Sequence, residues 1–125
     1  MSTRYEPGSA HIERYRGDSH SEVFTVRDSD GAAVDITGAT VRFTVKEHLH
    51  QDQAAAVLAK SAADVDEVEI TDPTQGEFTV KFTAAEMQAL TPNRYVYDAE
   101  VTLSGGAVHT VACDVFDVLS DVSTP

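Results

Sequence analysis

Hydrophobic and polar residues alternate along most of this chain, in short runs that turn residues separate. Phe24 and Val26 share one face of their run, and Val41, Phe43 and Val45 share one face of the next long run. Successive side chains of an extended strand point to opposite faces of a sheet, so a period of two indicates a strand with one buried face. The alternation therefore predicts half-buried β-strands here.

The same period of two continues through the rest of the chain. The further residues expected to face the core are Val34, Ile36, Val68, Ile70, Phe78, Val80, Phe82, Tyr95, Tyr97, Ala99, Val101 and Leu103. Turn signals lie between the runs, among them Asp-Gly at 30–31 and Ser-Gly-Gly at 104–106. About seven short strands with regular turns predict an all-β fold, an immunoglobulin-like antiparallel β-sandwich. A small closed barrel is the rival architecture.

The alternation breaks in the last run of the chain. Val111, Cys113 and Val115 would lie on one face, and Phe116 and Val118 on the other. This pattern is typical of a β-bulge or of a strand that is buried on both faces. With valines on either side, the cysteine is predicted to be a small buried hydrophobic residue and not a reactive thiol.

One short helix is expected near residues 84–90. Thr83 as N-cap and Glu86 three residues later form a capping box, in which each side chain accepts a hydrogen bond from the other residue's backbone. Met87 and Leu90 are three residues apart and would both face the core.

The segment before residue 68 is less regular. Its alanines would tolerate a helix, but Val57, Leu58 and Lys60 could equally form a short edge strand. The two ends of the chain are polar and rich in turn-forming residues. We therefore expect an extended N-terminal arm at residues 1–9, a sandwich at residues 10–119 and a flexible tail at residues 120–125.

Composition limits the possible partners. A chain of 125 residues suits one domain. The count of 9 basic against 21 acidic side chains gives 9 − 21 = −12. Because binding to DNA depends on cationic side chains that replace counterions on phosphates, this charge argues against nucleic acid and against anionic membranes as partners. One cysteine excludes an intramolecular disulfide, and no apolar leader precedes the fold, so folding in a reducing cytoplasm is expected.

Candidate metal ligands are weak in this sequence. Asp28, Asp30 and Asp35 resemble the start of a calcium loop, but the bidentate glutamate that such a loop needs is missing. His48 and His50 could share a metal, yet no third ligand with suitable spacing follows. The acidic run at 64–72 is better explained as charge that prevents edge-to-edge aggregation. No metal or cofactor is expected.

Catalytic motifs are also weak. Ser, His and Asp are present, but no Gly-x-Ser-x-Gly turn exposes a nucleophile, so we do not expect an enzyme. One of Tyr95 and Tyr97 is expected to hydrogen-bond back to the backbone, as tyrosines at the start of a late strand do in such sandwiches.

The tripeptide Arg16-Gly17-Asp18 matches the signal that adhesion receptors recognise. Its structural interpretation is a bend between two strands, for which Gly17 supplies backbone freedom and the Asp18 carboxylate accepts from nearby amides. We favour this interpretation over adhesion.

Several stretches together resemble the N-terminal domain family of phage baseplate upper proteins. They are "DITGATVRFTVK" (35–46) with the Asp-Gly turn before it, then "VEITDPTQGEFTVKF", "TAAEMQAL", "YVYDAEV" and "DVFDV". The resemblance covers about residues 12–119. It departs from the family at Asn93 and Asp114, where glycine is common.

The resemblance implies a non-enzymatic structural protein of a tailed-phage virion, folded in the host cytoplasm. Its implied partners are other virion proteins, namely major capsid, tail or baseplate subunits, and a homo-oligomer on the particle is expected. Two placements compete: a capsid decoration or cement subunit, and a head–tail or baseplate adaptor.

The N-terminal arm is the expected contact element. Arg4 and Tyr5 are a cation and an aromatic ring ahead of an otherwise acidic body, so we predict that they bind the partner. The alternative function is a carbohydrate-binding or host-cell-surface-binding module. That alternative lacks the usual platform of exposed aromatic rings, since the chain has no tryptophan.

Overall fold

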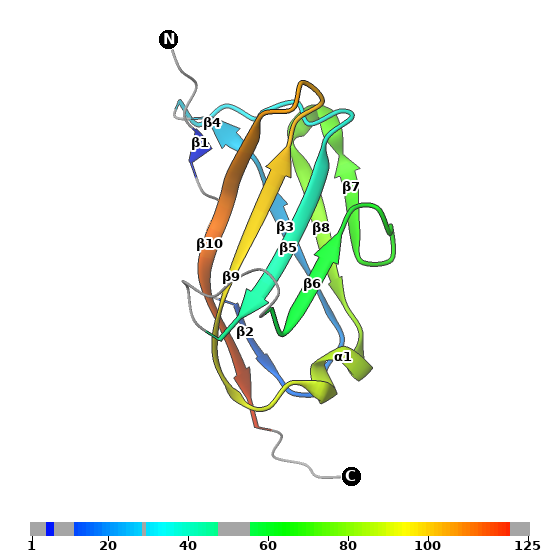
Figure 1. Cartoon of the computed structure of the whole chain (residues 1–125), viewed down its shortest axis with the longest axis vertical. Coiled ribbons are helices and arrows are strands. Elements are labelled where there is room, and N and C mark those ends of the chain that lie inside the picture. The colour runs from blue at the N-terminus through cyan, green and yellow to red at the C-terminus, as the bar shows by residue number, and fades with distance from the viewer. Residues whose placement is uncertain (1–4, 7–11, 29, 48–55, 121–125) are drawn as a thin grey trace.

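The chain folds into two β-sheets that pack face to face (Figure 1). The computed structural model describes residues 5–6, 12–28, 30–47 and 56–120. One sheet has five strands in the order β2-β10-β9-β5-β6, and the other has three in the order β3-β8-β7. Their bounds are β2 Ile12–Tyr15, β3 His20–Thr25, β5 Thr40–Lys46, β6 Leu58–Ser61, β7 Val68–Asp72, β8 Glu77–Phe82, β9 Asn93–Thr102 and β10 Val108–Leu119.

Four smaller elements complete the described structure. Strands β1 (Tyr5–Glu6) and β4 (Arg27–Asp28) form a separate two-stranded ribbon. The helix α1 (Ala84–Ala89) connects β8 to β9, and a 3-10 turn (Pro73–Gln75) connects β7 to β8.

The immunoglobulin-like β-sandwich predicted from the alternation is confirmed, with one difference in strand direction. All pairs within the two sheets are antiparallel except β2 with β10, which run parallel. Parallel neighbours cannot be joined by a hairpin. Here β2 and β10 are far apart in the sequence, and the other strands of both sheets lie between them along the chain.

The core lies between the sheets and is rich in aromatic rings. Phe43 stacks on Tyr97 with ring centroids 5.2 Å apart, and Phe24 stacks on Phe78 at 5.3 Å. Offset stacking suits the quadrupoles of these rings, and each buried ring contributes about 2 kcal/mol through the hydrophobic effect. The residues predicted to face the core are buried or pack against its edge, as Ile70 and Leu103 do.

A bulge in β10 changes which side chains face the core. The register with β9 shifts between Thr110 and Ala112, and both Val111 and Ala112 are buried. The bulge was one of the two predicted explanations. After it, alternate residues face the core from Ala112 onward, so the burial predicted for Cys113 is wrong and its side chain is exposed. An extra residue in one strand reverses the phase of every side chain that follows.

The predicted capping box is present at the start of α1. Thr83 accepts a hydrogen bond from the Glu86 amide at 3.1 Å, and the Glu86 carboxylate accepts one from the Thr83 amide at 3.0 Å. Met87 is fully buried and Leu90, just beyond the helix, is nearly so. The irregular segment that precedes β7 contains the edge strand β6, which was one of the two alternatives for it.

Candidate functional site

The predicted arm contacts fall at the two-stranded ribbon. Arg4 lies outside the described residues, whereas Tyr5 belongs to β1 and pairs with Asp28 of β4. In Figure 1, β1 and β4 lie near the upper end of β10. The backbone at Tyr5 is therefore attached to the sandwich through this ribbon. The role of both residues in partner binding stays a prediction.

The tripeptide at residues 16–18 forms the bend between β2 and β3. Gly17 has a φ of 89°, which favours glycine, and the Asp18 amide donates to the Tyr15 carbonyl at 3.2 Å. Arg16 reaches across to the end of α1, where its Nε donates to the carbonyls of Gln88 and Leu90 at 3.0 and 3.1 Å. A cation is favourable there because the last carbonyls of a helix lack partners within it.

The acidic turns use their carboxylates to bind backbone amides. Asp28 accepts from the amides of Asp30 and Ala32 at 2.9 and 3.0 Å, and Asp35 accepts from the Thr37 amide and hydroxyl. These hydrogen bonds lower the pKa of the exposed Asp35. Both carboxylates thus stabilise turns, Asp28 the turn at residues 28–32 and Asp35 the one at residues 35–37.

Metal-ligating side chains do not gather in the described part of the chain. Within it, no three His, Cys, Asp or Glu side chains lie close enough together to hold an ion. His48 and His50 lie outside the described residues. Cys113 lies on the outer face of the sheet, and its partial burial, together with the charges of Asp98 and Asp114, raises the pKa of its thiol. This environment lowers the thiolate fraction and hence its reactivity.

Three charged or polar side chains link the two sheets beside β2 and β3. Arg14 donates to Glu22 at 2.8 Å, and His20 Nδ1 lies 3.0 Å from the same carboxylate. Burial by itself would raise the pKa of Glu22, but the contacts with His20 and Arg14 outweigh it, so the pKa lies below its usual value. The His20 ring stacks on Phe82 with centroids 4.4 Å apart, and its Nε2 is buried without a hydrogen-bond partner in the described structure.

A second ion pair lies at the opposite edge of the five-stranded sheet. Lys60 of β6 points inward and is 2% exposed, and its Nζ contacts both carboxylate oxygens of Glu86 at 2.8 and 2.7 Å. The ammonium also lies 5.3 Å from the centre of the Phe82 ring. Burial tends to raise the pKa of Glu86, but Lys60 and the capping box lower it overall. The edge strand is thus joined to the helix cap.

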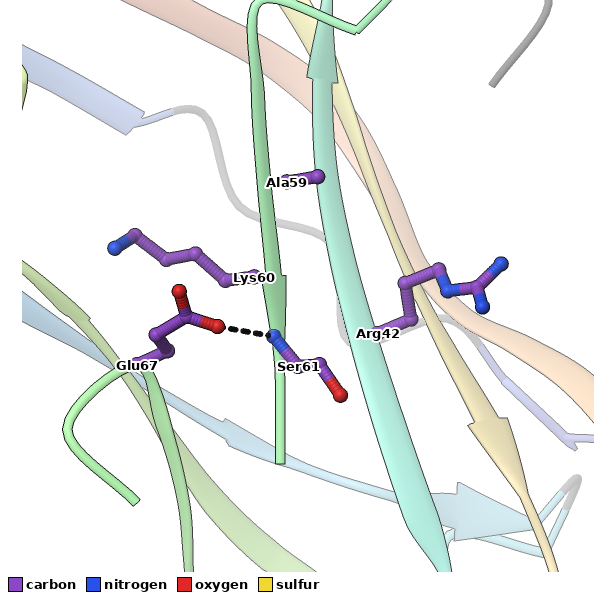
Figure 2. A pocket seen from close by; sticks show the side chains of 5 residues that line it. All are labelled: Arg42, Ala59, Lys60, Ser61 and Glu67. Atoms are coloured by element: carbon purple, nitrogen blue, oxygen red, sulfur yellow. Dashed lines mark hydrogen bonds between the residues drawn. The ribbon is translucent and has the colours of Figure 1, made fainter. Parts of the chain in front are cut away.

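A hollow of about 340 Å³ lies beside β6. Its lining residues are Arg42, Ala59, Lys60, Ser61 and Glu67. Figure 2 shows Lys60 and Glu67 on one side of the strand, and Arg42 pointing away from them from β5. Glu67 accepts a hydrogen bond from the Ser61 amide at 3.1 Å, which the dashed line marks. The hollow therefore borders the edge of the sheet and its groups do not converge on one point.

Most cations of the described chain have acceptors within the protein. Besides Arg14, Arg16 and Lys60, Arg27 contacts the Gly31 carbonyl, Lys81 contacts Glu69 and Arg94 contacts Asp117. Because the chain carries a net charge of −12, this internal pairing leaves a surface on which unpaired carboxylates predominate. A basic partner surface is electrostatically complementary to it.

Aromatic rings are almost all in the core. Among the described Phe and Tyr side chains, Tyr15 is the exposed one, at 49%. Tyr95 donates from its hydroxyl to the Thr91 carbonyl at 2.7 Å, which is the backbone contact predicted for one of the two tyrosines. No helix in the described ranges is long and apolar enough to cross a bilayer.

Sequence reasoning did not identify the hollow or the ion pair at β6. The sequence places Lys60 only in a segment that could be a helix or an edge strand. It identifies Glu86 as part of the capping box and not as the partner of a lysine. The two residues are 26 positions apart. The one signal in the sequence is a lysine at an inward position of a possible edge strand, which native sheets use against unwanted pairing.

The comparisons with known proteins give one family and distant structural likenesses. CopC from Methylosinus trichosporium OB3b is 13% identical, with a TM-score of 0.49, over 99% of this chain and 100% of that chain. Murine CRIg is 9% identical, with a TM-score of 0.33, over 96% and 97% of the two chains. No curated protein matches the chain.

The family comparison covers most of the sequence. The model of the BppU N-terminal domain matches residues 2–106, which include the ribbon, both sheets up to the end of β9 and the capped helix. The matched range overlaps the resemblance seen in the sequence motifs over residues 12–106, whereas the last of those motifs, "DVFDV", lies beyond it. The chain therefore belongs to the BppU N-terminal domain family, that of the phage baseplate upper protein.

Proposed function

We propose that this chain is a non-enzymatic structural subunit of a tailed-phage particle, held to neighbouring virion proteins by protein–protein contacts. The observation that carries the proposal is the family match over residues 2–106. The surface described above supports it, because a rigid sandwich with open sheet edges and excess carboxylates suits docking onto a basic protein. Repetition around a symmetry axis would let weak contacts add up.

The family favours a baseplate or tail adaptor over a capsid decoration subunit. An adaptor would be present in few copies around a threefold or sixfold axis, and as a homo-oligomer there. A decoration subunit would be present in many copies over the head. Quantitative staining of purified particles, with the major capsid protein as the internal standard, distinguishes these placements. Absence of the chain from purified particles would contradict the proposed function altogether.

The N-terminal residues are the proposed contact element. Deleting residues 1–9 removes Arg4 and Tyr5 together with the strand β1, but leaves both sheets of the sandwich. We expect the truncated chain to keep its circular dichroism spectrum and to be incorporated into particles less efficiently. Tyr5→Ser tests the ring alone, with Tyr15→Ser, an exposed tyrosine of β2, as its matched control. Full incorporation of the truncated chain would show that the arm is not the contact.

A further inference from the structure

The strand β6 has one free side. In the described structure it pairs with β5 and with no other strand. The Ala62 amide donates to the Val41 carbonyl at 2.9 Å, and the register pairs Phe43 with Lys60. Hydrogen-bonded and non-hydrogen-bonded pairs alternate along antiparallel strands. Ala59 and Ser61 therefore direct their backbone N–H and C=O groups away from β5, toward the free side.

The backbone amides on the free side of β6 are not bound by another described strand. The Ala59 amide has no hydrogen-bond partner among the described residues, and Ala59 is exposed. The Ser61 amide is bound by the carboxylate of Glu67, a side chain that can turn away by rotation about its own bonds. Among the described residues, the position of a neighbouring strand is thus taken only by the Glu67 side chain. If that side chain turns away, the edge can pair with an added strand.

The hollow lies where an added strand would run. Three of its lining residues, Ala59, Lys60 and Ser61, belong to β6, and Figure 2 shows their side chains. Because alternate side chains of a strand point to opposite faces, every second side chain of an added segment would enter this space. Lys60 does not obstruct it electrostatically, since Glu86 already neutralises its charge.

The negative charge beside the free side of β6 favours an added segment that is positively charged. Asp64, Asp66 and Glu67 follow β6 in the connection to β7, and Glu69 lies at the start of β7. Carboxylates at a sheet edge repel acidic chains, and a second copy of this chain is strongly acidic. A segment that carries lysine or arginine would be attracted to the same site.

We propose that β6 accepts an extended segment bearing Lys or Arg from another virion protein, which adds to the five-stranded sheet as a sixth strand. Main-chain hydrogen bonds to Ala59 and Ser61 hold the segment, and the carboxylates after β6 bind its cations. That the partner is a virion protein rests on the proposed function. The strand addition itself and its preference for a basic segment do not.

The first test uses a capped heptapeptide of alternating threonine and lysine with the purified ¹⁵N-labelled chain. We expect the amide resonances of Ala59 and Ser61 to shift and both amides to exchange more slowly with solvent. A threonine–glutamate peptide of equal length is the charge control. The threonine–lysine peptide with N-methylated backbone amides is the hydrogen-bond control. Both controls are expected to bind at least tenfold more weakly.

Variants locate the site. Ala59→Pro removes the free N–H without breaking a bond to β5, and proline is tolerated on edge strands in this orientation. It is expected to lower peptide affinity at least tenfold. Val23→Pro is the matched control, because Val23 is exposed and its amide likewise faces away from the neighbouring strand on β3. Should Ala59→Pro fail to fold, Glu67→Gln keeps the acceptor for Ser61 and should weaken binding severalfold and reduce its salt dependence.

Two results would overturn the inference. One is the absence of binding by the threonine–lysine peptide. The other is equal binding by the N-methylated peptide without shifts at Ala59 and Ser61, which would show general attraction to the acidic surface. Phage particles give a separate test. If they incorporate the wild-type chain and the Ala59→Pro variant equally well, this inference is contradicted but the proposed function is not. Failure of the wild-type chain to be incorporated would contradict the proposed function instead.

Discussion

At the scale of single residues, the three members of the Arg-Gly-Asp tripeptide have different structural roles. Arg16 binds the last carbonyls of α1 and Gly17 provides the left-handed turn, while the Asp18 carboxylate has no partner in the described structure. The Asx turn expected for Asp18 is thus not formed. An adhesion signal needs its arginine and aspartate both free, and here the guanidinium is engaged. This arrangement favours the structural interpretation.

The tripeptide can be tested by comparing two truncations. Arg16→Ala removes two hydrogen bonds to helix carbonyls and is expected to lower the free energy of unfolding by about 1 kcal/mol. Asp18→Ala removes an exposed carboxylate and is expected to change it by less than about 0.5 kcal/mol. Urea denaturation of both variants measures the difference. Equal effects would mean that Arg16 does not stabilise the end of α1.

The pairing of Lys60 with Glu86 is the other residue-scale feature that bears on stability. Glu86→Ala would leave a buried ammonium without its carboxylate and would also remove half of the capping box. Because the glutamate is partly exposed, we expect a loss of about 2 to 3 kcal/mol in the free energy of unfolding. Gln88→Ala, an exposed change on the same helix, is the control and should be nearly neutral. A small effect of Glu86→Ala would show that water replaces the carboxylate.

At the scale of elements, a bulge, a short helix and a tight turn control how the strands are placed in the two sheets. The bulge at Val111 lets β10 bury residues on both sides of it, and the capped helix redirects the chain from β8 in one sheet to β9 in the other. The turn between β7 and β8 ends at Gly76, whose φ is 71°. The backbone of this turn packs directly on that of Val26 and Val34, so it joins the turn to the strand β3 and its continuation.

Gly76 allows a sharp test of this close packing. A Cβ atom there would lie 2.6 Å from the Val34 carbonyl oxygen and 2.8 Å from that of Val26. Because both neighbours are backbone atoms, Gly76→Ala is expected to cost more than about 2 kcal/mol. Gly105→Ala, in the open turn between β9 and β10, meets no atom within 4 Å and should be nearly neutral. Thermal denaturation of the pair tests the contrast.

At the scale of the whole molecule, an acidic chain keeps its few cations at positions that join elements. Arg14 with Glu22 bridges the two sheets, Lys60 with Glu86 joins β6 to α1, and Arg94 with Asp117 joins β9 to β10. Other described carboxylates, among them Asp30, Asp64 and Asp66, are exposed. One set of charges therefore maintains the fold, and another is available to a partner.

The paired carboxylates make stability depend on pH in a definite direction. The folded pKa of Glu22 is lower than its ordinary value of 4.5. Its contribution is therefore fully present above pH 4.5 and is lost as pH falls through the folded pKa. We expect the difference in unfolding free energy between the wild type and Glu22→Gln to be largest near neutrality and to shrink below pH 4.5. A difference that does not change with pH would contradict the ion-pair network.

The sequence determined the features that depend on neighbouring residues. The period of two gave the strands and their buried faces, and the spacing of Thr83 and Glu86 gave the helix and its cap. Motifs along the chain were also enough to indicate the family. These signals are local, since a strand's alternation and a capping box are each complete within a few residues.

Only the tertiary structure decided the features that depend on distant partners. Cys113 is exposed because the bulge is placed two residues before it, and a register cannot be fixed from one strand alone. The parallel pairing of β2 with β10, the carboxylate that meets Lys60 and the free side of β6 all follow from how the sheets assemble. Alternation states that a strand has a buried face, but hydrogen bonding across strands decides which edge remains open.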